Sequence, residues 1–367
     1  MKKVFGFLIF FFLILMSATA LGQEYFNLAD IRSQALEGWH KTYTDKYGRN
    51  TKVDINVEVF GGETAPVLKV AYPASGPEFR LIRKNPYDSV TNVKKTGGRR
   101  THIYRTWGEQ VDFDKAYGKD YGNSLTVREM YDYLFELLEQ NNISKDSFLF
   151  DQPALLDVLC NVKQATGEVV APAFYHISLW PKLRDLPILT HAMASYKKRG
   201  TPDCEPRLSY LMRNKEENTL YISTMEEVEL IAPDIPLCSY DHVISNLSKK
   251  IEDGHIQKVF SLRFGYALYN NPNMSSQEIA AFDADYFYAV PSWVIECVYM
   301  VNPKETHTYS YEESLEYDPD TSERSALNVK TITIDAQTGK MLEPTDTSKK
   351  GFGNADFQGF IPWEKIS

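Results

Sequence analysis

Apolar residues recur at helical spacing in three segments of the chain. The first segment, 27–46, begins at Asn27 as a candidate N-cap and repeats apolar residues at intervals of three and four, namely Leu28, Ile31, Ala35, Trp39 and Tyr43. The second begins at a Thr126–Glu129 capping box, and its apolar stripe is Val127, Met130, Tyr131, Leu134 and Leu138. The third begins near Ser239 and reaches Gly254 at its end, with Tyr240, Val243, Ile244, Leu247 and Ile251 on one side. Each segment predicts an amphipathic helix.

Strand-like runs lie between and after these helices, and apolar and polar residues alternate cleanly at 53–59. Residues 53–59 and 67–72 flank Gly61-Gly62 and predict an antiparallel hairpin. Further strands are predicted at 155–162, 174–180, 207–213, 219–223, 256–268 and 286–301, with a polar hairpin turn at 214–218.

The last predicted strand, 331–336, ends at a turn with a definite chemistry. Asp335 can accept backbone N–H groups from the residues that follow it, and Gly339 can take a positive φ without a Cβ clash. Residues 340–342 are therefore expected to return as a short strand.

The order of one helix and then several strands occurs three times, beginning near residues 27, 126 and 239. A single apolar stripe can cover one face of a small antiparallel sheet. We therefore predict an α+β fold of repeated units, each with one amphipathic helix packed on an antiparallel β-meander. The expected parts are a signal peptide (1–20), a helix-plus-hairpin region with a linker (21–124), a middle helix-plus-sheet unit (125–238), a C-terminal unit (239–343) and a tail (344–367).

The first residues predict export. Lys2 and Lys3 precede an apolar run, 4–16, and Ala18-x-Ala20 fits a signal-peptidase site, with Ala20-x-Gly22 as the second choice. The run is short for a membrane span, which needs roughly 20 residues, so an uncleaved anchor is the alternative. We expect an extracytoplasmic protein, secreted or associated with the cell envelope, that touches the membrane only if this segment stays uncleaved.

Composition argues against one class of partner, nucleic acid. The 367 residues are 43% hydrophobic and 24% charged, which is ordinary for a globular protein, and the formal net charge is −9. A mildly acidic surface argues against binding to nucleic acid.

The four cysteines leave two readings open. Cys160, Cys204, Cys238 and Cys297 contain no C-x-x-C pair, so a zinc ribbon or thioredoxin-type site has no support. In an exported protein they could form up to two disulfides in three alternative pairings, or some could be buried free thiols.

The C-terminal unit resembles the PepSY-like domains of exported bacterial envelope proteins. The resemblance is carried by the helix 240–251, the strand 259–269, the segment 291–295 and the run 331–340, which ends in Asp335-Ala336-Gln337-Thr338-Gly339-Lys340. The middle unit is similar at 174–180 and 184–188, where Asp185-Leu186 departs from the family's turn. The whole chain also resembles secreted or lipid-anchored bacterial families of unknown function through 53–57, although it lacks a lipobox Cys. The resemblance implies a PepSY- or cystatin-like helix-on-sheet fold and a role in inhibition or regulation, and it brings no catalytic residues.

Candidate chemistry is sparse. No H-E-x-x-H or G-x-S-x-G motif accompanies the seven histidines, His40, His102, His176, His191, His242, His255 and His307. Four local patterns offer candidate sites, and an ordinary structural role is the favoured interpretation of each. They are a Glu37–His40 metal pair, a phosphate cradle at 94–100, calcium ligands at Asp283, Asp285 and 312–320, and an aromatic groove of 286–288 with Trp293. A Cys–His nucleophile assembled in space stays open. No catalytic, cofactor-binding or metal residue is assigned.

These observations favour a non-enzymatic cell-envelope protein that binds or regulates a protein or peptide partner, for instance by adding a strand at an exposed sheet edge. The alternative is an extracytoplasmic hydrolase whose site is assembled from distant residues. A third class, a small-molecule carrier, requires a sizeable apolar pocket. A concave cluster of titratable side chains would favour the enzyme, and an exposed edge or apolar patch without such a cluster would favour the binding protein.

Overall fold

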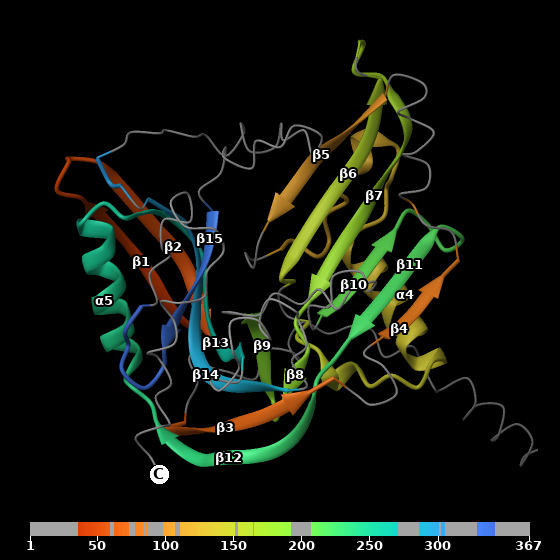
Figure 1. Cartoon of the computed structure of the whole chain (residues 1–367). Coiled ribbons are helices and arrows are strands. Elements are labelled where there is room, and N and C mark those ends of the chain that lie inside the picture. The colour runs from red at the N-terminus through yellow and green to blue at the C-terminus, as the bar shows by residue number, and fades with distance from the viewer. Residues whose placement is uncertain are drawn as a thin grey trace, which may run out of the picture.

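A computed structural model describes residues 36–58, 62–72, 78–83, 86, 98–106, 111–150, 153–163, 165–191, 207–270, 286–300, 302–304 and 329–341. The described residues are mostly β-structure with two α-helices, an α+β fold (Figure 1). The signal-peptide and tail segments predicted from the sequence lie outside them.

One half of the molecule is a six-stranded antiparallel sheet with the strand order β4-β11-β10-β7-β6-β5. Its strands are β4 (Glu78–Ile82), β5 (Gly98–Thr106), β6 (Leu155–Lys163), β7 (Val169–Leu179), β10 (Arg207–Met212) and β11 (Asn218–Ser223). The helix α4 (Val127–Gln140) packs on one face, and two short 3-10 helices, η1 (Lys119–Tyr121) and η2 (Lys145–Ser147), flank it in the chain.

The other half is a curled, seven-stranded mixed sheet with the order β12-β3-β14-β13-β9-β8, and β15 pairs with β14 as well. Its strands are β3 (Thr64–Ala71), β8 (Lys182–Leu183), β9 (Leu186–His191), β12 (Glu226–Pro236), β13 (Ile256–Asn270), β14 (Phe287–Tyr299) and β15 (Val329–Asp335). β13 and β9 run parallel. The helix α5 (Tyr240–Glu252) and the two-stranded sheet β1 (Leu36–Thr44) and β2 (Asn50–Glu58) share a core with it.

Both described helices confirm their sequence predictions. α4 begins at the Thr126 capping box, in which the Thr126 side chain accepts from the Glu129 N–H and the Glu129 side chain accepts from the Thr126 N–H. Every residue of its predicted apolar stripe is buried. α5 begins at Ser239 as N-cap, and Gly254 follows it with a φ of +81°, a conformation that glycine adopts at no steric cost.

The predicted helix at 27–46 is wrong where the structure describes it, because residues 36–44 form strand β1. Trp39 and Tyr43 are buried, as expected, and Trp39 donates a hydrogen bond to the Tyr43 hydroxyl. A spacing of four fits a strand as well as a helix, since four is a multiple of the strand period of two. The alternating strand β2 pairs with every residue of β1, and this long-range ladder decides the conformation.

The predicted hairpin between 53–59 and 67–72 is also wrong, although both segments contain strands. β2 pairs with β1, whereas β3 pairs with β12 and β14. The two strands therefore belong to different sheets, and the expected threefold repeat of helix-plus-meander units is not shown.

Along its described strands, the chain crosses between the two large sheets four times, after β3, β7, β9 and β11. Strands β4 and β5 thus join the same sheet as β6 and β7, while β9 and β12 join the sheet of β13 and β14. The two halves therefore interlock, and the boundaries of the sequence-defined parts stay a prediction.

The turn after β15 confirms its predicted chemistry. The Asp335 Oδ1 atom accepts the backbone N–H groups of Gln337 at 2.8 Å and Thr338 at 2.7 Å, and Gly339 has a φ of +67°. The returning residue Met341 forms a single antiparallel bridge with Ile334.

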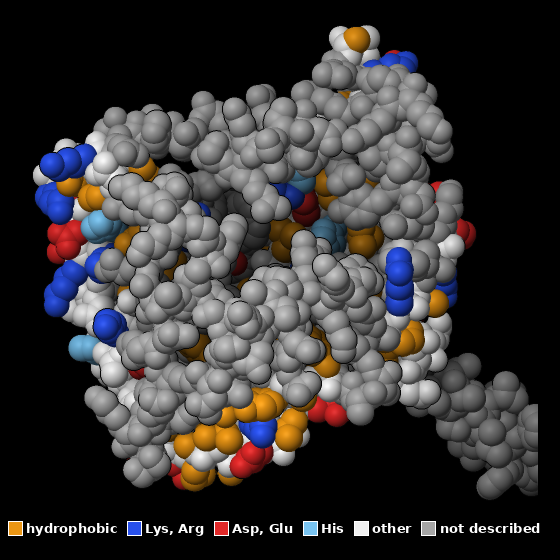
Figure 2. All heavy atoms as spheres, in the orientation of Figure 1, with side chains coloured by type: hydrophobic (Ala, Val, Ile, Leu, Met, Phe, Trp, Pro, Cys, Tyr) orange, Lys and Arg blue, Asp and Glu red, His pale blue; other side chains and the backbone are white. Residues whose placement is uncertain are grey.

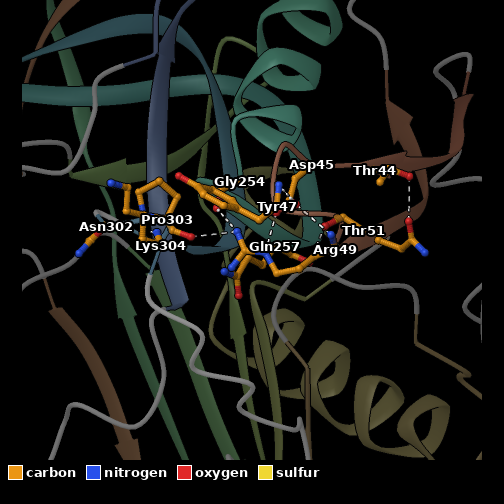
Figure 3. Close-up of polar contacts among 11 residues, drawn as sticks. Thr44, Asp45, Tyr47, Arg49, Thr51, Gly254, Gln257, Asn302, Pro303 and Lys304 are labelled. Atoms are coloured by element: carbon orange, nitrogen blue, oxygen red, sulfur yellow. Dashed lines mark hydrogen bonds and ion pairs between the residues drawn. The ribbon is translucent and has the colours of Figure 1, made fainter.

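The β1–β2 turn is fastened to the end of α5 by Asp45 and Arg49 (Figure 3). The Asp45 carboxylate accepts the backbone N–H groups of Tyr47 and Arg49 at 2.8 and 2.9 Å, and it accepts the Arg49 Nε–H at 2.6 Å. Arg49 Nη2 then donates to the backbone carbonyls of Pro303 at 3.0 Å and Gly254 at 3.4 Å. Burial raises the pKa of Asp45, but these hydrogen bonds lower it more, and the net shift is downward. This turn joins two segments about 200 residues apart.

Replacing Asp45 with alanine should therefore destabilise the protein by on the order of 2–3 kcal/mol, because the N–H groups of Tyr47 and Arg49 and the Arg49 guanidinium lose a buried, charged acceptor. Urea unfolding measures the change. Asp253→Ala is the matched control, since its 3.5 Å ion pair with Lys46 is exposed and contributes only about 0–1 kcal/mol. Equal losses in the two variants would contradict the account.

Candidate functional site

The face of the six-stranded sheet opposite α4 is polar. Side chains alternate across each strand, and those on the α4 side form the apolar core, for example Val158, Tyr175, Tyr210 and Leu220. Those on the other side include His102, Arg105, Asp157, His176, Ser178, Arg207, Ser209, Thr219, Tyr221 and Ser223. We call this set the polar face. α4 lies behind the sheet in Figure 1, so the polar face is turned to the viewer.

Asp157, the third residue of β6, is the buried anion of the polar face. Its carboxylate contacts His102 Nδ1 at 2.8 Å and accepts hydrogen bonds from Arg105 Nε at 3.1 Å and Arg105 Nη2 at 2.5 Å. Burial raises the pKa of Asp157, but the hydrogen bond to His102 and the charge of Arg105 lower it more, so the pKa is lowered overall. Asp157 is thus ionised, and its negative charge is compensated by His102 and Arg105 of β5.

His176, on β7 directly opposite Asp157 in the register, lies beside Ser209 of β10. The distance from His176 Nε2 to Ser209 Oγ is 2.9 Å. Burial lowers the pKa of His176 to about 4, while the Asp157 charge opposes that shift and Arg207 and Arg105 add to it. The imidazole is therefore neutral at pH 7, and no hydrogen bond joins it to Asp157 among the described residues.

Three more hydroxyls of the polar face are buried without a hydrogen-bond partner in the described part of the chain. They are Ser178 Oγ on β7, and Thr219 Oγ1 and Ser223 Oγ on β11. A buried hydroxyl without a partner costs roughly 1–3 kcal/mol, so such groups are usually rare. The polar face therefore has hydrogen-bonding capacity that the described residues do not use.

The edge of the seven-stranded sheet approaches the six-stranded sheet at Trp180, just after β7. Trp180 Nε1 donates to the Leu189 carbonyl at 3.2 Å, and its side chain packs with Leu189 and Val294. The Arg263 guanidinium lies 5.0 Å from the Trp180 ring centroid, and its Nη1 is 3.7 Å from Glu58 Oε2. In the orientation of Figure 1, Figure 2 shows a hollow near the middle of the molecule, with basic, acidic and His side chains visible beside it in the region of β5 and β6.

The metal pair considered at Glu37 and His40 is not supported. Both residues lie on strand β1, where side chains three positions apart point to opposite faces. His40 Nδ1 instead contacts Asp54 Oδ1 across the hairpin at 2.6 Å. Within the described ranges, no group of three or more His, Cys, Asp or Glu side chains could hold a metal ion.

The aromatic groove considered at 286–288 and Trp293 is largely core. Phe287 and Trp293 are buried, and Trp293 packs edge-on against Phe264 with centroids 5.3 Å apart. The acidic segments at Asp283, Asp285 and 312–320 and the basic loop at 94–97 lie outside the described residues.

A thiol nucleophile finds no support at the cysteines that the structure describes. Cys160, Cys238 and Cys297 are free thiols, and Cys204 lies outside the described residues. Cys160 points into the core under α4, where burial raises its pKa to about 11. Burial also raises the pKa of Cys297, so neither thiol is activated as a thiolate.

The exposed edge expected for strand addition has a counterpart in β12, the outer strand of the seven-stranded sheet. Val228 and Leu230 are exposed there, at 56% and 41%. However, the ladder to β3 has three register shifts, and β12 contains three glutamates and two prolines. Bulges, charge and proline are the devices by which edge strands avoid pairing with further strands. The edge thus gives little support to strand addition.

The sequence pattern did not single out the polar face, because its members come from five strands between residues 102 and 223. A signal was nevertheless present. Polar residues occupy alternate positions at His176 and Ser178, and Asp157 and Asn161 interrupt an otherwise apolar strand. A strand that is apolar on one face and polar but buried on the other is a local conflict typical of functional sites.

Comparisons with known proteins give no family. No protein-family model and no curated protein matches the chain. Among solved structures, the fold is similar to an uncharacterized protein from Eubacterium rectale ATCC 33656, with 10% identity, a TM-score of 0.41, and coverage of 87% of this chain and 98% of that chain. A likeness of this degree carries no argument about function, and the PepSY resemblance gains no support from it.

The described helices include none long and apolar enough to cross a bilayer.

The lowered pKa of His176 predicts a pH dependence of stability. The unfolded imidazole takes up a proton near its ordinary pKa of about 6.5, while the folded one does so only near 4. The unfolded state therefore binds more protons between these values, and the free energy of unfolding should fall as the pH is lowered from about 6.5 to about 4. Asp157 acts in a lower window, because its lowered pKa removes stability only as the pH falls below its ordinary value near 3.8.

Urea unfolding at several pH values measures this slope, and His176→Gln is the variant that isolates it. The difference in free energy of unfolding between wild type and His176→Gln should shrink as the pH falls through that window. A difference that stays constant from pH 7 to pH 4 would show that His176 titrates equally in both states.

Proposed function

We propose that the chain is an exported, non-enzymatic bacterial cell-envelope protein that binds a protein or peptide partner on its polar face. The proposal of export rests on the basic and apolar pattern of residues 2–20, and the PepSY-like motifs of the C-terminal unit are consistent with it. The observation that carries the binding proposal is the set of buried hydroxyls on the polar face that have no partner among the described residues. Polar groups that a fold leaves unpaired are suited to a ligand that supplies the missing hydrogen bonds.

Catalysis on this face is the second candidate, because a cluster of titratable side chains does occur there. The 2.9 Å contact between Ser209 Oγ and His176 Nε2 is the specific observation that favours a hydrolase. A neutral imidazole could accept the proton of an attacking hydroxyl.

Two features weigh against a hydrolase. Asp157 is bonded to His102 and Arg105 rather than to His176, so no carboxylate orients the imidazole within the described residues. Ser209 also lies inside β10, with Ser178 and Tyr221 opposite it in the ladders on its two sides. A serine in the middle of a sheet has its neighbouring backbone N–H groups aligned with ladder carbonyls, whereas an oxyanion hole needs such groups free.

One reagent distinguishes the binding protein from the hydrolase. A fluorophosphonate probe labels an activated serine, and we expect the mature chain, starting at residue 21, to remain unlabelled because Ser209 lacks an oriented base and an oxyanion hole. Mass spectrometry of the intact chain measures the adduct. Labelling that disappears in Ser209→Ala and persists in Ser178→Ala would establish the hydrolase instead.

Binding is tested by affinity capture from intact cell envelopes with the mature chain as bait. We expect a partner that wild type retains and that His176→Gln/Ser209→Ala loses, because this variant removes a hydrogen-bonded pair from the polar face. Quantitative mass spectrometry of the captured proteins compares the baits.

The matched control is His242→Gln/Ser248→Ala, which removes the same residue types from α5, away from the polar face. The control should capture as much partner as wild type. Equal capture by all three baits would place the binding surface elsewhere.

A further inference from the structure

We propose that the Arg184–Glu227 ion pair is an electrostatic latch, which closes the curled seven-stranded sheet and releases the turn between β8 and β9 when salt screens the pair. Three observations support the latch. They concern the two ends of the sheet, the geometry of the ion pair, and the backbone strain of the turn that contains Arg184.

The two ends of the seven-stranded sheet meet without pairing. β12 and β8 are the outermost strands in the order β12-β3-β14-β13-β9-β8, and no ladder joins them among the described strands. The sheet nevertheless curls so far that Arg184, in the turn between β8 and β9, contacts Glu227 of β12. Figure 1 shows β8 beside the beginning of β12. A side-chain contact therefore joins two strands that no backbone ladder connects.

The contact is a two-pronged ion pair. Arg184 Nε donates to Glu227 Oε2 at 2.7 Å, and Arg184 Nη2 donates to Glu227 Oε1 at 2.6 Å. Parallel hydrogen bonds of this kind make the strongest and most specific pairs between arginine and a carboxylate. The Arg184 side chain is 45% exposed and that of Glu227 is 29% exposed. Dissolved ions can therefore approach both groups and weaken their attraction.

The latch lies over the apolar core of this half of the molecule. Glu227 is opposite Val70 in the ladder of β12 and β3, so the two side chains share a face of the sheet. Leu183 and Leu186, which flank the turn, are buried in the same core cluster as Val70 and Tyr266. Burial raises the pKa of Tyr266, and the charges of Arg184 and Glu227 act on it in opposite directions. The ion pair thus closes the sheet above buried residues of β3 and β13.

The turn that contains Arg184 is strained. Leu183 pairs with Leu186, and the two residues between them have positive φ angles, +45° at Arg184 and +69° at Asp185. Two-residue hairpin turns with two positive φ angles usually contain glycine or asparagine, because a side chain with a bulky Cβ disfavours this conformation. Strain of this kind persists only where surrounding contacts hold the backbone. Arg184 supplies such a contact through Glu227.

The far part of β9 is held independently of the latch. Ile188 and the residues up to His191 pair in parallel with β13, and the Ile188 N–H donates to the Pro181 carbonyl at 2.8 Å. The backbones also approach closely, since a Cβ added at Gly265 would lie 2.4 Å from the Pro187 carbonyl oxygen. Opening of the latch should therefore be confined to residues 182–186.

Hydrogen exchange of the full-length mature chain, followed by mass spectrometry of overlapping peptides, measures how often this segment opens. The amides of 182–186 should exchange roughly threefold faster in about 1 M sodium chloride than in about 10 mM, because the Debye length falls from about 30 Å to about 3 Å. The amides of 188–191 should exchange equally in both. The interior of α4 is the reference for effects of salt on exchange throughout the chain.

Two variants test whether the ion pair causes this dependence on salt. Arg184→Gln should exchange at the faster rate in 182–186 at both salt concentrations, because it lacks the charge that salt would screen. Arg184→Glu/Glu227→Arg restores a pair with the charges exchanged, so it should recover slow exchange at low salt together with the dependence on salt. A turn held by packing alone would show neither the loss nor the recovery.

Arg128→Gln is the matched control, since Arg128 forms a similar two-pronged pair with Asp114 beside α4, at 2.7 and 3.3 Å. It should leave the exchange of 182–186 as in wild type at both salt concentrations. Four outcomes would each overturn the latch: exchange of 182–186 that ignores salt, an Arg184→Gln variant as protected as wild type, a charge-exchanged pair that stays unprotected, or acceleration that spreads equally over all strands.

Discussion

The buried charge of Asp157 is the constraint around which the polar face is arranged. A buried carboxylate on a strand inside the sheet loses its hydration, and only close partners can compensate for that loss. His102 and Arg105 provide them from the adjacent strand, so β5 is held to β6 by side chains as well as by its ladder. His102 and Arg105 already bond the Asp157 carboxylate from β5. His176, on β7 at the other side of β6, therefore lies beside an anion that has its partners. Its imidazole stays neutral and pairs with Ser209 instead.

This arrangement follows from a general limit on sheets covered by one helix. α4 buries one face of the six-stranded sheet and leaves the second face to be satisfied in another way. A soluble antiparallel sheet usually exposes such a face to water, and its side chains are then polar and hydrated. Here the second face has the polar composition of a solvated sheet, but most of its members are buried. Its hydroxyls therefore have neither water-accessible surface nor, in the described residues, protein partners.

The chain passes back and forth between the two large sheets, and this path connects the two halves of the molecule. Each large sheet contains strands from several parts of the sequence, so the two halves are not independent domains that could separate from one another. Arg263 of β13 rests on Trp180 at the end of β7, which places a side chain of one sheet against the other. The two halves are therefore held together by long-range ladders, and their relative arrangement can lose order only if those ladders open.

Local rules predicted the parts of the fold whose signals are local. The capping box at Thr126, the stripe of α5 and the Asp335 turn each depend on residues within a few positions of one another, and all three are confirmed. Strand partners could not be predicted in the same way. Trp39 and Tyr43 suit a helix or a strand equally, and the parallel pairing of β9 with β13 joins segments about 80 residues apart. The candidate site was missed for the same reason, since His102, Asp157, His176 and Ser209 meet only through such pairings.

The imidazole of the half-buried His176 is neutral at pH 7, and the ring itself reports on this state. A pH titration of the His176 ring nitrogens by NMR, in protein labelled with ¹⁵N at histidine and assigned with His176→Gln, measures its protonation state directly. We expect a neutral ring that takes up a proton only near pH 4. A ring that becomes protonated near pH 6.5, as a freely hydrated histidine does, would contradict it.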